Sequence, residues 1–294
     1  MKKVIMNKEC AAVAKQQGQK KEMILNFGKI LASLAVILLL ANGARAADHK
    51  LVLTGSSTVA PLALEIAKRF EKQNPGVRVD VQSGGSSRGM ADARSGLAGI
   101  GMVSRALKPE ENDLTAHTIA MDGVGIILHR DNPVQSLTDQ QIKAIYSGSI
   151  TNWKAVGGKD ARITVVNKAE GRSTLELFLH HFALKNSAIK AQVVVGENQQ
   201  GIKTVAGNPG AIGYVSIGSA EYEAGQGTPI KLLPMEGVVA TVISVRDGRF
   251  PLSRPLNLVT KGEPSGLTKR FIDFARSGAI HDLVEAQFFV PLAR

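Results

Sequence analysis

The chain repeats one local pattern three times: an apolar run typical of a strand, a short turn of glycine and hydroxyl residues, and a run with helical periodicity. The three turns are Thr54-Gly55-Ser56-Ser57-Thr58, Gln82-Ser83-Gly84-Gly85-Ser86-Ser87-Arg88-Gly89 and Glu170-Gly171-Arg172-Ser173-Thr174. Strands that alternate with helices in this way are typical of α/β architecture. The sequence therefore predicts an α/β fold with largely parallel sheets.

Apolar runs and cap signals predict the other elements. A helix is expected from Val59 to Phe70, and another begins at Thr138, which forms a capping box with Gln141. Strands are expected at residues 51–53, 77–81, 119–128, 163–166, 193–195, 211–215, 231–233, 238–245 and 255–259. We predict one lobe from residues 47–127 plus 240–294 and a second lobe from residues 128–239. Two strands would then cross between the lobes and form a hinge beside an interlobe cleft.

The N-terminal residues 1–46 have the features of a signal peptide. A long lysine-rich region precedes an apolar run from Ile30 to Ala41, which is too short to span a membrane, and Ala44-Arg45-Ala46 provides a cleavage site. We expect cleavage after Ala46 and export, with an uncleaved anchor as the alternative. The only cysteine, Cys10, lies in this segment, so the exported chain would have no disulfide or thiol metal site.

Removal of this segment changes the charge of the protein. The full chain has a formal net charge of +11, whereas residues 47–294 hold 28 basic and 23 acidic residues, a net charge of about +5. A mild positive charge suits an anionic ligand. Because aromatic residues are scarce and no basic stripe is interleaved with them, we do not expect nucleic-acid binding.

The three turns are suited to holding a small anion. Each leads from a strand into a helix, where the first backbone N–H groups lack intrahelical partners and the helix dipole is positive. Ligands of open α/β sheets bind at the carboxyl ends of the strands, so the turns are expected to converge. Arg105, Lys168 and Arg172 would neutralise the anion. The alternative is that the three turns are ordinary helix caps.

At the level of motifs, the chain resembles the phosphate-binding proteins of phosphate ABC transporters. The three turns carry the resemblance together with Gly101-Met102-Val103-Ser104-Arg105 and Pro251-Leu252-Ser253-Arg254-Pro255-Leu256. It implies a type II periplasmic-binding-protein fold that closes on phosphate and delivers it to a membrane ABC permease. It also implies a periplasmic, monomeric protein that is not an enzyme and needs no cofactor.

The resemblance implies ligand contacts from all three turns. The implied residues are Ser57, Thr58 and the amide of Val59 in the first turn, Ser86 in the second, and Arg172, Ser173 and Thr174 in the third. Two positions depart from the family pattern, because Ser104 stands where well-known members carry an aspartate and Lys168 where they carry an arginine. The third turn also has Arg-Ser-Thr in place of Ser-Gly-Thr. Without the aspartate, another oxyanion such as sulfate or molybdate is an alternative ligand.

Two other functions compete with oxyanion binding. Gly85-Ser86-Ser87-Arg88-Gly89 matches the G-x-S-x-G motif of serine hydrolases, with Ser87 as the nucleophile and His281 late enough in the chain to be the catalytic histidine. This reading leaves the other two hydroxyl-rich turns unexplained. A secreted scaffold with a vestigial cleft is the third possibility. The histidines lack metal-site spacing, so we expect no metal, and no nucleotide-binding GxxxxGK[ST] motif is present.

Overall fold

A computed structural model describes residues 49–292 of the chain. The predicted signal peptide, residues 1–46, and Cys10 lie outside these residues. Within them, no helix is long and apolar enough to cross a membrane. Residues from Lys50 onward belong to one compact unit.

Strands and helices alternate along the chain as expected. The strands are β1 (Lys50–Gly55), β2 (Arg78–Ser83), β3 (Ile100–Val103), β4 (Leu114–His129), β5 (Thr164–Lys168), β6 (Val193–Val195), β7 (Ala211–Ser216), β8 (Ile230–Leu232) and β9 (Ser253–Lys261). The helices are α2 (Ala60–Gln73), α3 (Ser86–Ser95), α4 (Asp139–Tyr146), α5 (Ser173–His181), α6 (Asn198–Ala206), α7 (Ile217–Gly225), α8 (Val242–Arg246), α9 (Gly266–Ala275) and α10 (His281–Ala286). Short 3-10 turns lie at Pro109–Glu111, Trp153–Val156, Asn186–Ala188 and Gly278–Ile280.

Local sequence signals explain where several helices begin and which face they bury. Leu62, Ile66 and Phe70 lie four apart on α2, so they share the buried face of that helix. Thr138 caps α4 by accepting a hydrogen bond from the amide of Gln141, whose side chain accepts one in return. The predicted capping box is therefore confirmed.

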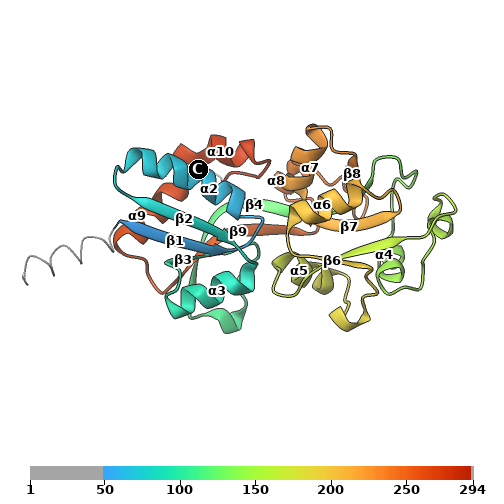
Figure 1. Cartoon of the computed structure of the whole chain (residues 1–294), viewed down its shortest axis with the longest axis horizontal. Helices are drawn as coiled ribbons and strands as arrows, with labels where there is room; N and C mark the ends of the chain where they lie inside the picture. Colours follow the sequence, from blue (N-terminus) through green and yellow to red (C-terminus); the bar gives the residue numbers. More distant parts are fainter. Residues whose placement is uncertain (1–48, 293–294) are drawn as a thin grey trace, which may run out of the picture. The chain divides into compact units, whose positions relative to one another are not determined.

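The strands form a mixed sheet in the order β2-β1-β3-β9-β4-β7-β5-β6, with β8 also paired to β4 (Figure 1). β1 is parallel to β2 and β3, and β5 is parallel to β6 and β7. β4 is antiparallel to β7, β8 and β9, and β9 is antiparallel to β3. The α/β prediction is confirmed. The expectation of largely parallel sheets was too simple, because β4 and β9 lie in the middle of the strand order and are antiparallel to each other.

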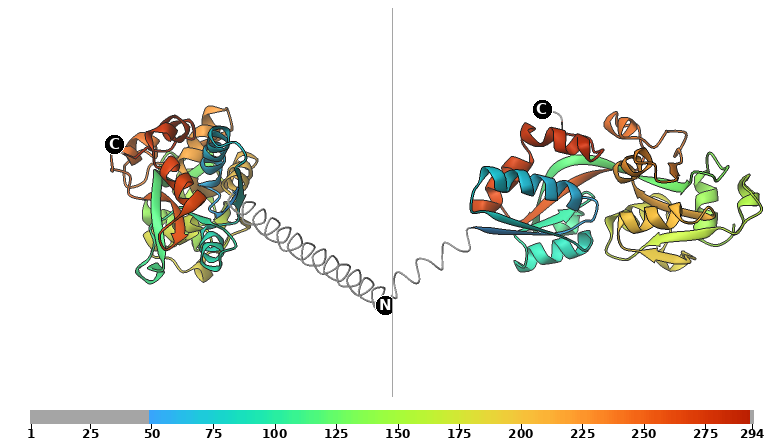
Figure 2. Two further views of the ribbon diagram at one scale, coloured as in Figure 1. Left: turned by 90° about the vertical axis from the view of Figure 1, so that its left-hand side faces the viewer. Right: turned by 45° about the horizontal axis from the view of Figure 1, so that its top comes forward.

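Strand β4 links two regions of the molecule. Its first part, Leu114–Gly123, pairs with β9, and its second part, Val124–Leu128, pairs with β7. Figure 2 shows β4 and β9 running between two groups of strands and helices. β4 corresponds to the first of the two predicted crossing strands, whereas the second was expected at residues 238–245 and its place is taken by β9.

Separate apolar cores lie at the two ends of β4. The first core joins β1, α2, β3, α9 and α10 and includes the fully buried Leu53, Ile66 and Phe271. The second contains Phe178 stacked on Tyr214, with ring centroids 4.0 Å apart, and a further cluster around Ile202 lies between α6 and the sheet. Two cores joined by two strands could move relative to each other by bending of those strands.

The segment that returns from the second core differs from expectation. Residues 238–245 were predicted as a strand, but Val242–Arg246 form helix α8, which Thr241 caps by accepting from the amide of Ser244. Ala240 and Val245 pack in the second core, as does Val124 of β4. We therefore propose lobe boundaries near residues 123 and 253 rather than at 127 and 240.

Candidate functional site

The three glycine- and hydroxyl-rich turns meet at one small pocket between the two cores. The space in it, including the part open to solvent, is about 210 Å³. The residues around it are Ser56, Ser57, Thr58, Gly85, Ser86, Ser104, Lys168, Arg172, Ser173, Thr174, Gly196 and Asn198. Eight of the ten residues predicted for the site thus lie around one cavity, and the exceptions are Val59 and Arg105.

The first turn lies between β1 and α2 and is organised by Ser56. Its hydroxyl oxygen accepts from the amides of Thr58, at 3.2 Å, and Val59, at 3.4 Å, and donates to the hydroxyl of Ser104 at 3.0 Å. The amide of Val59 is thus engaged inside the turn, and Val59 is not a lining residue. Ser56 positions the turn, a role that the sequence analysis did not assign to it.

The second turn lies between β2 and α3 and depends on Gly85. This residue has φ +98°, a conformation that side chains other than glycine rarely adopt. A Cβ atom there would lie 2.8 Å from the carbonyl oxygen of Gly171 and 2.9 Å from Cδ of Arg172, both in the third turn. Gly85 therefore allows the second and third turns to touch. The neighbouring Ser86 hydroxyl, 1% exposed, accepts from the amide of Ser104 at 3.3 Å.

The third turn begins helix α5 and holds buried polar atoms that lack hydrogen-bond partners. Ser173 is 1% exposed, and its hydroxyl has no hydrogen-bond partner among the described residues. The same is true of Nη1 of Arg172, although this nitrogen lies 3.2 Å from a carboxylate oxygen of Glu197. Buried polar groups are normally satisfied, so the unpartnered hydroxyl of Ser173 at a helix N-terminus indicates a place for a polar ligand.

Hydrogen bonds join the two sides of the pocket, both across it and beside it. The amide of Ser87 donates to the carbonyl oxygen of Gly171 at 3.2 Å, and Nδ2 of Asn198 donates to the hydroxyl of Thr58 at 3.0 Å. From β9, Arg254 donates to the hydroxyls of Thr58, at 3.2 Å, and Thr174, at 3.0 Å. These bonds hold the two sides of the pocket together.

Positive charge is concentrated in and behind the pocket. Lys168 is 3% exposed, and burial, with Arg254 and Arg172 nearby, lowers its pKa from 10.5 to about 7. Its ammonium donates to the carbonyl oxygen of Glu197 at 2.9 Å and to Oδ1 of Asn198 at 3.2 Å. The guanidinium of Arg254 forms a buried ion pair with Asp122 at 2.8 Å. An anion in the pocket would stabilise the charged form of Lys168.

Arg105 was predicted to neutralise the ligand, but its charged group is engaged elsewhere. It forms a buried ion pair with Glu111 at 2.7 Å and lies 3.1 Å from Glu176. Its carbonyl oxygen accepts from Nδ2 of Asn257, which lies on β9. Arg105 therefore belongs to the structural support next to the site and does not line the pocket.

Six residues at or behind the pocket were not among the predicted site residues: Ser56, Gly85, Gly196, Asn198, Asp122 and Arg254. Asn198 begins α6 without any glycine-rich turn before it, so no motif marks it. Arg254 is the second residue of β9 and lies in the segment Pro251–Leu256, which carries part of the family resemblance. That resemblance was the available signal for Arg254.

Comparison with known proteins places this architecture in a family. Residues 40–278 match the model of the PBP superfamily domain. The phosphate-binding protein PstS of Bacillus subtilis is 30% identical over 257 residues, which cover 86% of this chain and 84% of the relative.

Solved structures agree with the sequence matches. One is a phosphate ABC transporter substrate-binding protein from Clostridium perfringens, by the name its structure carries, with bound phosphate. It has 34% identity and a TM-score of 0.77, and the match covers 83% of this chain and 100% of that one. An ABC-type phosphate transport receptor from Vibrio cholerae has 31% identity and a TM-score of 0.68, covering 82% of this chain and 100% of that one. The periplasmic-binding-protein fold is confirmed, and the chain belongs to the PstS family of phosphate-binding proteins within the PBP superfamily.

Proposed function

We propose that this protein is an exported solute-binding protein that captures inorganic phosphate in the pocket between its two cores and delivers it to a membrane ABC permease. The pocket residues would hold the ligand without forming or breaking a covalent bond. Relatives that bind phosphate and take part in phosphate transport support this function. The signal-peptide pattern of residues 1–46 supports export.

One observation carries the proposal: the buried hydroxyl of Ser173 has no hydrogen-bond partner among the described residues, and Nη1 of Arg172 makes only an ion pair with Glu197 at 3.2 Å, while both residues border the pocket. An unsatisfied buried polar group costs about 1–3 kcal/mol. A tetrahedral oxyanion would accept hydrogen bonds from both groups, while Lys168 and Arg172 would balance its charge. The amides at the start of α5 add the positive end of a helix dipole.

Selectivity among oxyanions depends on whether the protein offers an acceptor for the hydrogen bond that a protonated ligand can donate. Monohydrogen phosphate carries a proton, whereas sulfate is fully deprotonated near neutral pH. Among the lining residues there is no carboxylate, and the hydroxyl of Ser104 already accepts from Ser56. We propose that Ser104 accepts the phosphate proton only weakly, so that phosphate is preferred over sulfate by less than an aspartate would achieve.

Calorimetric titration of the purified protein with phosphate, sulfate and molybdate tests the proposed function. We expect saturable binding of one phosphate per chain, with sulfate and molybdate weaker. Ser104→Asp should increase the preference for phosphate over sulfate. Tighter binding of sulfate or molybdate than of phosphate would reject phosphate as the ligand.

The hydrolase alternative is tested on the same samples with a fluorogenic ester. The amide of Ser87 donates to the carbonyl oxygen of Gly171, and Ser87 is not among the lining residues. We therefore expect no turnover, and Ser87→Ala should retain phosphate binding within about threefold. Ester hydrolysis that disappears in Ser87→Ala would instead establish an enzyme.

A further inference from the structure

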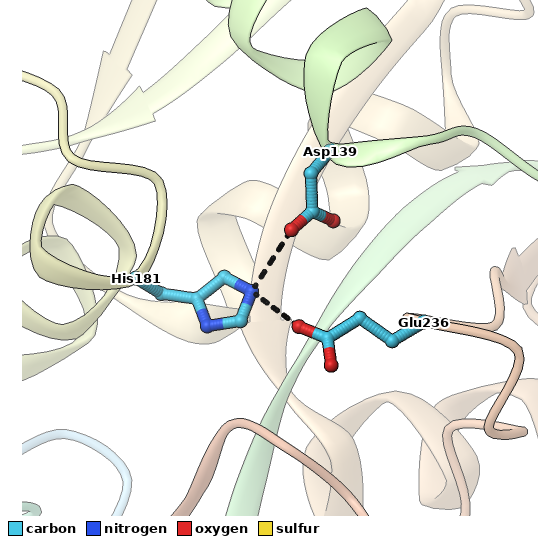
Figure 3. A group of neighbouring side chains, drawn as sticks. All are labelled: Asp139, His181 and Glu236. Atoms are coloured by element: carbon cyan, nitrogen blue, oxygen red, sulfur yellow. Dashed lines mark ion pairs between the residues drawn. The ribbon is translucent and has the colours of Figure 1, made fainter.

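A second group of polar side chains lies apart from the phosphate pocket. Asp139 at the start of α4, His181 at the end of α5 and Glu236 after β8 point toward one another (Figure 3). Nε2 of His181 lies 3.8 Å from a carboxylate oxygen of Asp139 and 3.6 Å from one of Glu236. All three potential ligand atoms lie within 4.8 Å of one another.

The imidazole nitrogen at the centre of this group is buried without being satisfied. Nε2 of His181 exposes less than 1 Å² and has no hydrogen-bond partner among the described residues, since both carboxylates lie beyond hydrogen-bond distance. A buried nitrogen in this state normally has a partner. Two carboxylates aimed at it make an anion an unsuitable partner and a cation a suitable one.

The spacing is close to that of a tetrahedral metal ion. Bonds of about 2.0–2.1 Å to nitrogen and oxygen place tetrahedral ligand atoms about 3.3 Å apart. The separations of 3.6 and 3.8 Å from Nε2 of His181 require shifts of a few tenths of an ångström, and the two carboxylate oxygens, which lie within 4.8 Å of each other, would have to approach to the same distance. The side chains of Asp139 and Glu236 are 38% and 53% exposed, so they can move and leave a fourth position open to solvent.

We propose that Asp139, His181 and Glu236 bind a zinc-class divalent transition-metal ion. One imidazole and two carboxylates suit zinc, whereas magnesium and calcium prefer ligand sets made only of oxygen. The ion would join α4, α5 and the segment after β8, all of which contribute to the second core. The site is separate from the phosphate pocket, because the nine residues of α5, about 13 Å of helix, separate His181 from Ser173.

Metal titration of the chelator-treated, untagged protein in phosphate-free buffer at pH 7 tests the proposal. Cys10→Ser in every sample keeps the only cysteine from contributing. Competition with a chromophoric zinc chelator should show one Zn²⁺ per chain, and His181→Asn and Glu236→Gln should each weaken it at least tenfold. Millimolar Mg²⁺ or Ca²⁺ should not displace the zinc.

The chain offers a matched control for these variants. His129 and Asp131 form a similar histidine–carboxylate pair at 3.8 Å but are not part of a three-ligand cluster. Asp131→Asn should therefore leave zinc affinity unchanged. Zinc binding that is absent, or equally strong in His181→Asn and Glu236→Gln, would overturn the proposal, as would displacement of zinc by equimolar Mg²⁺.

Discussion

Lys168 carries the pocket charge that is most sensitive to its surroundings. Its ammonium is buried near two arginines, and its pKa falls to about 7 because burial and positive neighbours disfavour the charged form. A bound anion reverses part of this effect. Phosphate binding and protonation of Lys168 should therefore be coupled.

The pH dependence of phosphate affinity follows from this coupling. Above pH 7 the free protein increasingly holds a neutral Lys168, so binding must take up a proton and affinity should fall by up to tenfold per pH unit. Lys168→Arg remains charged over this range. The ratio of wild-type to variant affinity, measured by calorimetry between pH 6 and 9, should fall as pH rises.

Phosphate itself titrates in this pH range and affects the affinity of both proteins equally. Its contribution therefore cancels in the ratio of wild-type to Lys168→Arg affinity. Calorimetry in buffers of different ionisation enthalpy should also show proton uptake by the wild type above pH 7. Parallel pH profiles for the two proteins would contradict the assigned role of Lys168.

Some residues of the site could be predicted from the sequence and others could not. Ser57, Ser86, Ser173 and Thr174 were implied as ligand contacts by the family resemblance that their turns carry, and the structure brings them to one pocket. Asn198 was missed because its place in the pocket depends on the packing of α6 beside the other turns. Tertiary contacts decide which charged residues reach the pocket and which form ion pairs elsewhere, as Arg105 does. The spacing of residues along the sequence does not reveal these contacts.

At the scale of elements, β4 and β9 are tied together by a buried ion pair next to the site. Asp122 accepts from Nε and Nη2 of Arg254 at 3.1 and 2.8 Å, and both side chains are about 1% exposed. Removing one partner of a buried pair leaves an uncompensated charge and typically costs about 3–5 kcal/mol. Asp122→Asn should lower the free energy of unfolding by this amount in phosphate-free denaturant titrations.

Phosphate should partly restore stability to Asp122→Asn because the anion supplies negative charge near Arg254. The gain in melting temperature on adding phosphate should therefore be larger in the variant than in the wild type. Asp113→Asn is the control, since the ion pair of Asp113 with Arg94 is exposed and should contribute less than about 1 kcal/mol. A small loss of stability in Asp122→Asn would contradict the role given to the buried pair.

The second turn should limit how closely the two sides of the pocket approach. Gly85→Ala places a methyl group against Gly171 and Arg172, so we expect phosphate affinity to fall at least tenfold. Gly96→Ala is the control, because Gly96 has φ +75° at the other end of α3, where an added Cβ meets nothing within 4 Å. Both variants carry backbone strain, but only Gly85→Ala should lose affinity in a calorimetric titration.

Local chemistry predicted most elements, and one exception is instructive. The helix capped at Thr138 was found because capping is a short-range interaction. Residues 238–245 are rich in β-branched residues, which favour strands, yet Thr241 caps a short helix there and Val245 packs into the second core. Tertiary packing overrode local propensity at that point.

At the scale of the whole molecule, the pocket lies where residues from both ends of β4 meet. The hydrogen bond from Asn198 to Thr58 crosses it, and the bond from Ser87 to Gly171 joins the second and third turns beside it. A ligand that contacts both sides favours the closed form through its differential affinity for the two states. We propose that closure about β4 and β9 presents the loaded form to the permease.

Small-angle scattering with and without saturating phosphate tests this closure. The radius of gyration should decrease on binding, because ligand-free molecules would populate more open forms. Gly85→Ala should show a smaller decrease than Gly96→Ala. Identical scattering curves for the free and saturated wild-type protein would rule out hinge closure.

The measurement that most directly tests phosphate capture by both sides of the pocket is a calorimetric phosphate titration of Ser57→Ala and Ser173→Ala. Ser57 lies in the first turn and Ser173 in the third, and each variant loses one hydroxyl. We predict that each loses about tenfold in affinity, or about 1.4 kcal/mol. Ser265→Ala should lose nothing, because this helix-start serine makes no capping bond. Unchanged affinity in either pocket variant would contradict the account that both sides hold one anion.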